Sequence, residues 1–158
     1  MDESLRLPPK KPVGELIWVA GGEVDECSVS LRFFGDNLDP DIITKTLDIA
    51  PTISYRKGDI LRGKTYDKIQ STGSWRYRTQ RHTDISLEDL IEKLFDRLTN
   101  DIAVWQDLTS KLQADLFCGL WLKRWNRSID FKPSILMKIA ERGLKIGLDI
   151  YFESDEDK

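Results

Sequence analysis

The stretch that decides the fold of this 158-residue chain lies between Ala114 and Phe152. It begins Ala114-Asp-Leu-Phe-Cys-Gly-Leu-Trp-Leu-Lys-Arg-Trp125, in which apolar side chains occupy both even-numbered and odd-numbered positions. A strand that is apolar on both faces is typical of the interior of a sheet. We therefore predict that residues 116–125 form a central strand, with its leucines under helices and Trp121 turned to the opposite side.

The remainder of this stretch predicts a β-α-β unit. Residues 133–142 form a short helical segment that begins at a proline, and Gly143 ends it. The strand that follows alternates strictly, with these apolar residues on one face: Leu144, Ile146, Leu148, Ile150 and Phe152. A period of two over nine residues is a strong strand signal.

The chain before this unit predicts further strands and a first helix. Four strands are indicated by alternation or by short apolar runs: residues 15–20, 27–34, 52–55 and 73–80. Asp39 is a favourable N-cap residue and Pro40 suits the first helical position. Residues 60–72 show no period, and we expect a mobile basic loop there.

The clearest helix signal covers residues 86–112. Ser86 and Asp89 resemble a capping box, and leucines, isoleucines and aromatic residues recur at helical spacing after them. Thr99-Asn100 is a candidate kink or break. With three helical segments, these patterns predict an α+β fold: a mostly antiparallel mixed sheet with helices packed on one face, in which ferredoxin-like β-α-β units are an option.

Length and composition indicate one ordinary globular domain. We expect a flexible proline-containing arm at residues 1–14, a single domain at 15–152 and an acidic tail at 153–158. No apolar run approaches the roughly 20 residues that span a bilayer, and no secretory signal is seen. Cys27 and Cys118 make no disulfide framework, so we expect a cytoplasmic protein with reduced thiols and no membrane partner.

Several segments, taken in order, resemble a bacterial family of domains of unknown function, numbered four-two-seven-nine. They are Ser30-Leu-Arg-Phe-Phe-Gly-Asp-Asn-Leu-Asp-Pro-Asp-Ile-Ile-Thr44, Ala50-Pro51-Thr52, Arg56-Lys-Gly-Asp59, Gly73-Ser-Trp75 and Arg142-Gly-Leu-Lys-Ile-Gly-Leu-Asp-Ile-Tyr151. The resemblance extends over residues 28–152 and implies a small bacterial protein with an α+β fold. It implies no activity and no catalytic residues.

Signals for catalysis are weak. His82 is the only histidine, and the chain has no H-E-x-x-H, G-x-S-x-G, Walker-type or G-x-G-x-x-G motif. A nucleophilic pair of His82 with Cys27 or Cys118 is a formal candidate, and a general acid/base pair among the 27 carboxylates would leave no sequence signature. We predict a protein that is not an enzyme and that needs no cofactor and no metal.

Two surfaces are candidates for binding. An aromatic and basic sheet face would bind single-stranded nucleic acid or another anionic ligand through Trp75, Arg76, Tyr77, Arg78, Trp121, Lys123 and Trp125. Residues 56–81 carry eight basic and two acidic side chains, a net +6 in a chain of net −3. The alternative is that residues 12–20 or 60–72 cover Trp121 and Trp125.

The other candidate surface is acidic and would contact a protein. It is one face of the predicted 86–112 helix, with Glu88, Asp89, Glu92 and Asp96, joined by the acidic tail. Such a surface steers a basic partner electrostatically. The preferred hypothesis is therefore a non-enzymatic protein-binding module, of immunity or regulatory type, with a toxin as one candidate partner; the alternative is the anionic-ligand binder.

Overall fold

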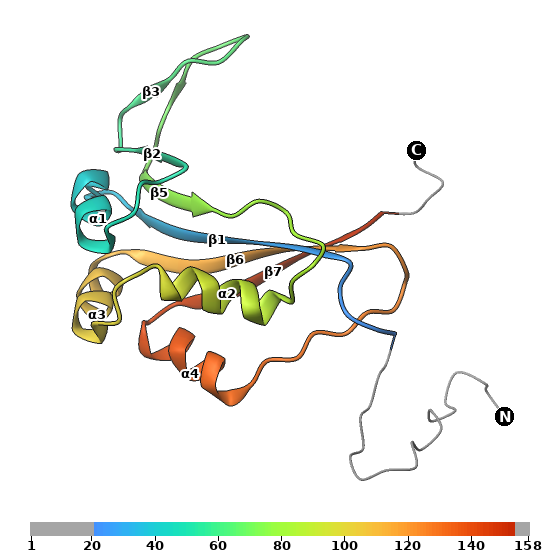
Figure 1. Ribbon diagram of the computed structural model, residues 1–158. Coiled ribbons are helices and arrows are strands. Elements are labelled where there is room, and N and C mark those ends of the chain that lie inside the picture. The colour runs from blue at the N-terminus through green and yellow to red at the C-terminus, as the bar shows by residue number, and fades with distance from the viewer. Residues whose placement is uncertain (1–20, 154–158) are drawn as a thin grey trace, which may run out of the picture.

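The computed structural model describes residues 21–153, which form a mixed sheet with helices on one side (Figure 1). The strands are β1 (Glu26–Gly35), β2 (Ile53–Tyr55), β3 (Ile60–Leu61), β4 (Lys68–Ile69), β5 (Gly73–Arg78), β6 (Gln113–Leu122) and β7 (Lys145–Phe152). The helices are α1 (Pro40–Leu47), α2 (Leu87–Asp96), α3 (Ile102–Lys111) and α4 (Pro133–Glu141). The predicted α+β class, with a mostly antiparallel sheet, is confirmed.

The main sheet has the strand order β2-β5-β1-β6-β7. All neighbouring strands are antiparallel except β6 and β7, which are parallel and are joined through α4. The predicted β-α-β unit is therefore present. β1 is the middle strand, and β6 lies beside it in the interior of the sheet rather than at its centre.

The core lies between the sheet and the helices. On β1 the helix-facing residues are Cys27, Val29, Leu31 and Phe33, all of them buried. The ring of Phe33 packs edge-on against Trp75 at 5.8 Å between centroids and stacks with Trp105 of α3 at 6.4 Å. Burial of apolar surface at about 25 cal/mol per Å² makes this layer the main source of stability.

β6 follows the predicted alternation. Leu116, Cys118 and Leu120 are buried on the helix side, and Trp121 points to the other side of the sheet, where it stacks with Tyr151. The strand ends at Leu122, so Trp125 belongs to the following loop and not to the sheet. The interior position and the facing of this strand agree with the sequence prediction.

The predicted long helix is two helices. α2 ends near Asp96, and α3 begins after Asp101, whose side chain accepts a hydrogen bond from the amide of Ala103 at 3.0 Å. The indole Nε1 of Trp105 donates to the carbonyl of Thr99 at 2.8 Å, so a side chain supplies the hydrogen bond that this carbonyl lacks where the helix is interrupted. The described residues thus hold four helices rather than three.

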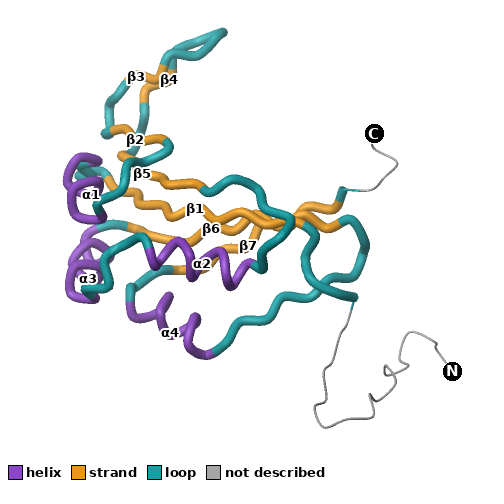
Figure 2. Tube along the Cα trace, in the orientation of Figure 1, coloured by secondary structure: helices purple, strands orange, loops and turns teal. Residues whose placement is uncertain are grey.

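Residues 60–72 are also more ordered than their sequence indicates. β3 and β4 pair as an antiparallel hairpin, and the amide of Gln70 donates to the carbonyl of Asp59 at 2.9 Å. Figure 2 shows this hairpin extending away from the sheet beyond β2. Two strands of two residues each are too short to show a period, which is why the pattern predicted a loop.

Some predictions fall outside the described residues. These are the arm at 1–14, the strand at 15–20 and the acidic tail beyond Glu153. Between residues 21 and 153, no helix has both the length and the apolar character needed to cross a membrane.

Candidate binding face of the sheet

The side of the main sheet that carries no helix forms the candidate site, and we call it the open face (Figure 1). Because side chains alternate along a strand, the residues that point to this side follow from the strand pairing. Its large side chains are Ile53, Tyr55, Arg76, Arg78, Phe34, Arg32, Phe117, Trp121 and Tyr151. None of the helices within residues 21–153 covers it.

Arg32 is the centre of the open face. Its Nε and Nη2 atoms donate to the two carboxylate oxygens of Asp115 on β6, both at 2.7 Å. Its guanidinium lies over the ring of Phe117 at 4.0 Å and near that of Phe34 at 5.3 Å. This bidentate pair, with Asp115 largely buried, fixes the position of the arginine and neutralises it.

Arg76 lies directly opposite Arg32 on β5. Its Nε donates to the hydroxyl of Ser74 at 2.9 Å, its Nη2 donates to the hydroxyl of Tyr55 at 3.3 Å, and its guanidinium stands 5.2 Å from the centroid of Phe34. Within residues 21–153 no carboxylate pairs with Arg76 or with the exposed Arg78. The β5 part of the open face therefore carries net positive charge.

Trp121 anchors the other end of the open face. Its ring stacks with Tyr151 of β7 at 5.4 Å and 12° between planes, and the guanidinium of Arg81 lies 3.9 Å from its centroid. Gly119 makes room for the indole, because a Cβ there would lie 2.6 Å from the ring edge. The indole is thus packed between neighbours and is not a free flat surface.

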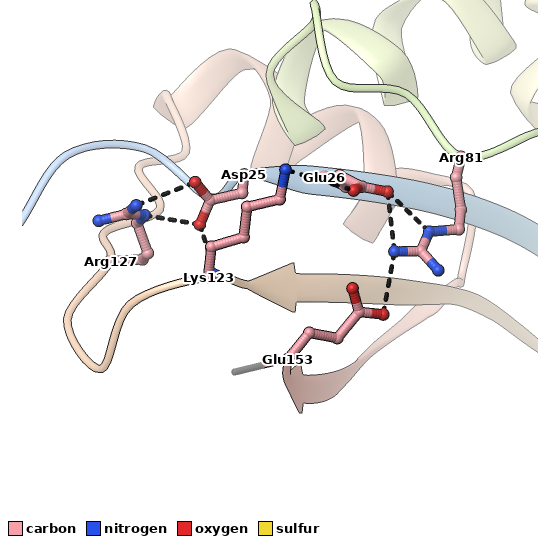
Figure 3. A network of polar contacts seen from close by, with 6 residues as sticks. All are labelled: Asp25, Glu26, Arg81, Lys123, Arg127 and Glu153. Carbon is pink, nitrogen blue, oxygen red and sulfur yellow. Dashed lines mark hydrogen bonds and ion pairs between the residues drawn. The ribbon is translucent and has the colours of Figure 1, made fainter. Parts of the chain in front are cut away.

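A polar network surrounds this end of the sheet, as Figure 3 shows. Arg127 donates to both carboxylate oxygens of Asp25, at 2.8 and 2.9 Å, and the amide of Lys123 donates to the same carboxylate. The hydrogen bonds from Arg127 are the main reason that the pKa of Asp25 falls from 3.8 to about 2. The pair ties the loop after β6 to the start of β1.

The second half of the network holds the end of β7. Arg81 pairs with Glu26 at 2.8 Å and with Glu153 at 3.2 Å, and the Nζ of Lys123 lies 4.0 Å from Glu26 (Figure 3). Because Arg81 also covers Trp121, the network and the aromatic pair form one unit. It fixes the border of the open face.

Trp75 and Tyr77 do not belong to the open face, which corrects the sequence prediction. Trp75 is fully buried among the helices and donates from Nε1 to the hydroxyl of Thr44 at 3.0 Å. Tyr77 is on the same helix-facing side, where its hydroxyl accepts a hydrogen bond from Arg97 at 2.9 Å. The register pairs Trp75 with the core residue Phe33, so alternation turns both aromatic residues inward.

The other predicted ligand residues divide between the open face and its border. Arg76, Arg78 and Trp121 lie on the open face, as described above. Lys123 follows the end of β6 beside Glu26, and Trp125 is 87% exposed in the next loop. The seven residues therefore do not form one patch.

Half of the predicted acidic partner surface is used inside the fold. Glu88 accepts a hydrogen bond from the amide of Lys132 at 2.5 Å and pairs with its Nζ at 3.3 Å. Glu92 pairs with Lys138 of α4 at 2.6 Å. These two carboxylates hold α4 beside α2, and of the four acidic residues only Asp89 and Asp96 are exposed. The acidic helix face is therefore smaller than predicted.

Asp115 is a residue of the open face that the sequence analysis missed. It is a carboxylate in an interior strand, flanked by Ala114 and Leu116. Buried carboxylates are rare unless they are paired, so its position was a signal for a basic neighbour. The identity of that neighbour, Arg32, depends on the pairing of β1 with β6, which the sequence does not show.

The formal nucleophilic pair lacks an activated thiol. Cys27 and Cys118 are both buried, and burial raises the pKa of each thiol, that of Cys118 to about 12. His82 is joined to Cys27 through backbone hydrogen bonds of 2.9 and 3.0 Å. No group of three or more metal-ligating side chains is found within residues 21–153.

Comparison with known proteins places the chain in a family. Residues 25–153 match the family model described as "Domain of unknown function (DUF4279)", which covers the whole main sheet and all four helices. No curated protein and no solved structure matches the chain. The chain therefore belongs to the DUF4279 family.

Proposed function

We propose that this chain is a non-enzymatic binding protein, of regulatory or immunity type, that contacts a partner protein through the open face. One observation carries the proposal: aromatic and arginine side chains alternate across a sheet surface that no helix within residues 21–153 covers. A face of this composition differs from an ordinary solvated sheet surface, which carries short polar residues and lysines.

The composition of the open face supports contact with a protein. Tyrosine, tryptophan and arginine are the residues enriched at the energetic centres of protein interfaces. Ile53 and Tyr151, at opposite borders of the face, are each 44% exposed. Between them, hydrogen bonds and aromatic rings hold the guanidinium groups of Arg32 and Arg76 in fixed positions, which lowers the entropy lost on binding.

The charge of the open face supports an acidic contact segment on the partner. Arg76 and Arg78 are two residues apart on β5 and therefore point to the same side of the sheet, and no carboxylate within residues 21–153 neutralises them. A fixed guanidinium binds a carboxylate through two parallel hydrogen bonds. This proposal moves the contact surface away from α2, because Glu88 and Glu92 are engaged with α4.

Single-stranded nucleic acid is the second candidate ligand. The basic residues Arg62, Lys64 and Lys68 are exposed on the β3–β4 hairpin, which extends beyond β2 at the edge of the main sheet. However, Phe34, Phe117 and Trp121 already have guanidinium groups over their rings. Base stacking would have to displace arginines, so the contacts available without rearrangement are to phosphates.

Site-specific photocrosslinking tests the protein-binding proposal. Benzoylphenylalanine is introduced at Ile53 on the open face or, as a control, at Met137, which is 66% exposed on α4. We expect a discrete crosslinked protein from position 53 and none from position 137. The crosslinked protein is then purified, and R76A and R78A are each expected to weaken its binding by about tenfold or more.

The outcome that contradicts the proposal is equal crosslinking from both positions, or binding that is unchanged in R76A and R78A. An oligothymidylate titration separates the second candidate. Quenching of tryptophan fluorescence that weakens steeply with salt, and that is absent in W121F, supports nucleic acid. We expect no quenching at low salt.

A further inference from the structure

We propose that β7 pairs antiparallel with β7 of a second copy of this chain, which makes a symmetric dimer with one continuous sheet. This inference does not depend on the proposed function, because it concerns the edge of the sheet and not the open face. It rests on the exposed apolar residues along β7, on the direction of its free backbone groups and on the complementarity of the strand with itself.

β7 is an edge strand that is neither short nor interrupted by a proline. It pairs with β6 on one side and with no strand of residues 21–153 on the other. Natural proteins shorten, bulge or interrupt exposed edges to prevent pairing. The opposite edge strand, β2, has three residues, whereas β7 has eight and contains no proline. As far as residues 21–153 are concerned, the long edge is therefore available to another strand.

The helix-facing side of β7 exposes an apolar row. Leu148, Ile150 and Phe152 are 44%, 59% and 58% exposed, whereas Leu144, which directly precedes β7, is buried. α4 packs on the first part of the strand and leaves the second part open (Figure 1). A contiguous exposed apolar surface of this kind marks an interaction site.

α4 adds to this apolar row. Ile135 and Ile139 face the sheet, and Lys138 points toward α2, where it pairs with Glu92. The helical period then places Leu136, which is 46% exposed, on the flank away from α2, above the free edge of β7. A strand added to that edge would cover Leu136 together with the row on β7.

The free backbone groups of β7 alternate. The amide of Glu153 donates to the carbonyl of Leu122, so this residue points its backbone toward β6. Successive residues of a strand direct their N–H and C=O groups to opposite sides. The even-numbered residues therefore direct theirs to the free edge: Ile146, Leu148, Ile150 and Phe152.

These positions fix the register of a symmetric pair. A twofold axis perpendicular to the sheet leaves the helix-covered faces of both copies on the same side. If Leu148 lies opposite Leu148 of the other copy, residues 144–152 of the two copies pair along their whole length. Lys145 then lies opposite Tyr151 and diagonal to Asp149 of the other copy, which gives two ion pairs. Placing Asp149 opposite itself would juxtapose like charges, and centring on Ile150 would shorten the overlap.

Sedimentation equilibrium of the full chain tests the dimer. We expect a monomer–dimer equilibrium in the wild type and a dimer Kd raised by about tenfold or more in L148K, because two ammonium groups would meet at the axis. M137K, another substitution at an exposed apolar residue, is the matched control and is expected to leave the dimer unchanged. Circular dichroism verifies that both variants are folded.

Cysteine crosslinking tests the register in the same chain. L148C is expected to form an intermolecular disulfide under mild oxidation, whereas I150C, which faces Ile146 of the other copy, is not. The native cysteines are buried and do not compete. A wild type that stays monomeric at all concentrations, or a dimer that persists in L148K, overturns the proposal. So does a dimer that forms only after deletion of residues 1–20, since that segment would then be the occupant of the edge.

Discussion

Arginines placed against aromatic rings occur on both sides of the sheet. On the open face they are partly exposed, as with Arg32 and Arg76. On the helix side, Arg142 is almost completely buried, lies 4.5 Å from the centroid of Phe95 and donates to the carbonyl of Lys138. Burial lowers the pKa of this guanidinium. Arg142 therefore joins α4 to the core, whereas the arginines of the open face are available for contact.

At the residue scale, Asp25 predicts a pH-dependent contribution to stability. Its pKa is about 2 in the folded protein, below the ordinary value of 3.8, chiefly because the Arg127 side chain donates hydrogen bonds to it. A depressed pKa stabilises the folded state above the unfolded value, and the effect is lost as the pH falls through the folded value. D25N is therefore expected to lower the free energy of unfolding by about 2 kcal/mol at most near neutral pH.

Urea denaturation at a series of pH values measures this effect. The difference between wild type and D25N is expected to shrink as the pH falls from about 4 toward 2, because Asp25 becomes protonated in both states. D67N, in the exposed β3–β4 connection, is the control and should show no such difference. A difference that is independent of pH would contradict the assigned role of the Arg127 pair.

At the scale of elements, the break between α2 and α3 makes the acidic residues of this region structural. Asp101 caps α3 through the amide of Ala103, as Ser86 caps α2 through that of Asp89. D101A is expected to lower the free energy of unfolding by about 1 kcal/mol, whereas D101N, which preserves a capping oxygen, should be near neutral. Chemical denaturation compares the two; equal losses would show that the cap is not the cause.

The two edges of the sheet differ at this scale as well. β2 is short and is followed by the β3–β4 hairpin, whereas β7 is long and lies uncovered by any strand of residues 21–153. α4 is only nine residues long and therefore covers the beginning of β7 and not its end. The length of one helix thus determines how much of the apolar row remains exposed.

At the scale of the whole molecule, the two cysteines report on global unfolding. Cys27 and Cys118 lie in the core on neighbouring strands, β1 and β6, and their thiols have raised pKa values. We expect both to resist iodoacetamide in the native protein and to become reactive together at the denaturant midpoint seen by circular dichroism. Mass spectrometry measures the labelling, and rapid labelling of native protein would contradict this account.

The layer arrangement explains why the open face exists. All four helices pack against one side of the sheet, so the other side has no covering layer among residues 21–153. When helices cover only one face of a sheet, the apolar surface of the other face can be shielded only by the side chains of that face. In this protein the interleaved arginine and aromatic residues, with the Arg32–Asp115 pair among them, perform that role.

Much of the fold was predictable from local patterns. The alternation in β1 and β7, the apolar strand β6, and the caps Asp39 and Ser86 all appear where the sequence indicated. The candidate site was predicted less well. Trp75 and Tyr77 alternate with Arg76 and Arg78, and alternation shows that the two pairs face opposite sides without showing which side is buried.

The sequence by itself determined most of the elements, the class of the fold and the interior position of β6, because these depend on periodicity and capping between near neighbours. Only the tertiary structure decided which faces meet: Trp75 in the core, Arg32 on Asp115, and Glu88 and Glu92 on α4. The physical reason is that these contacts join residues far apart in the chain, and strand order and register set them.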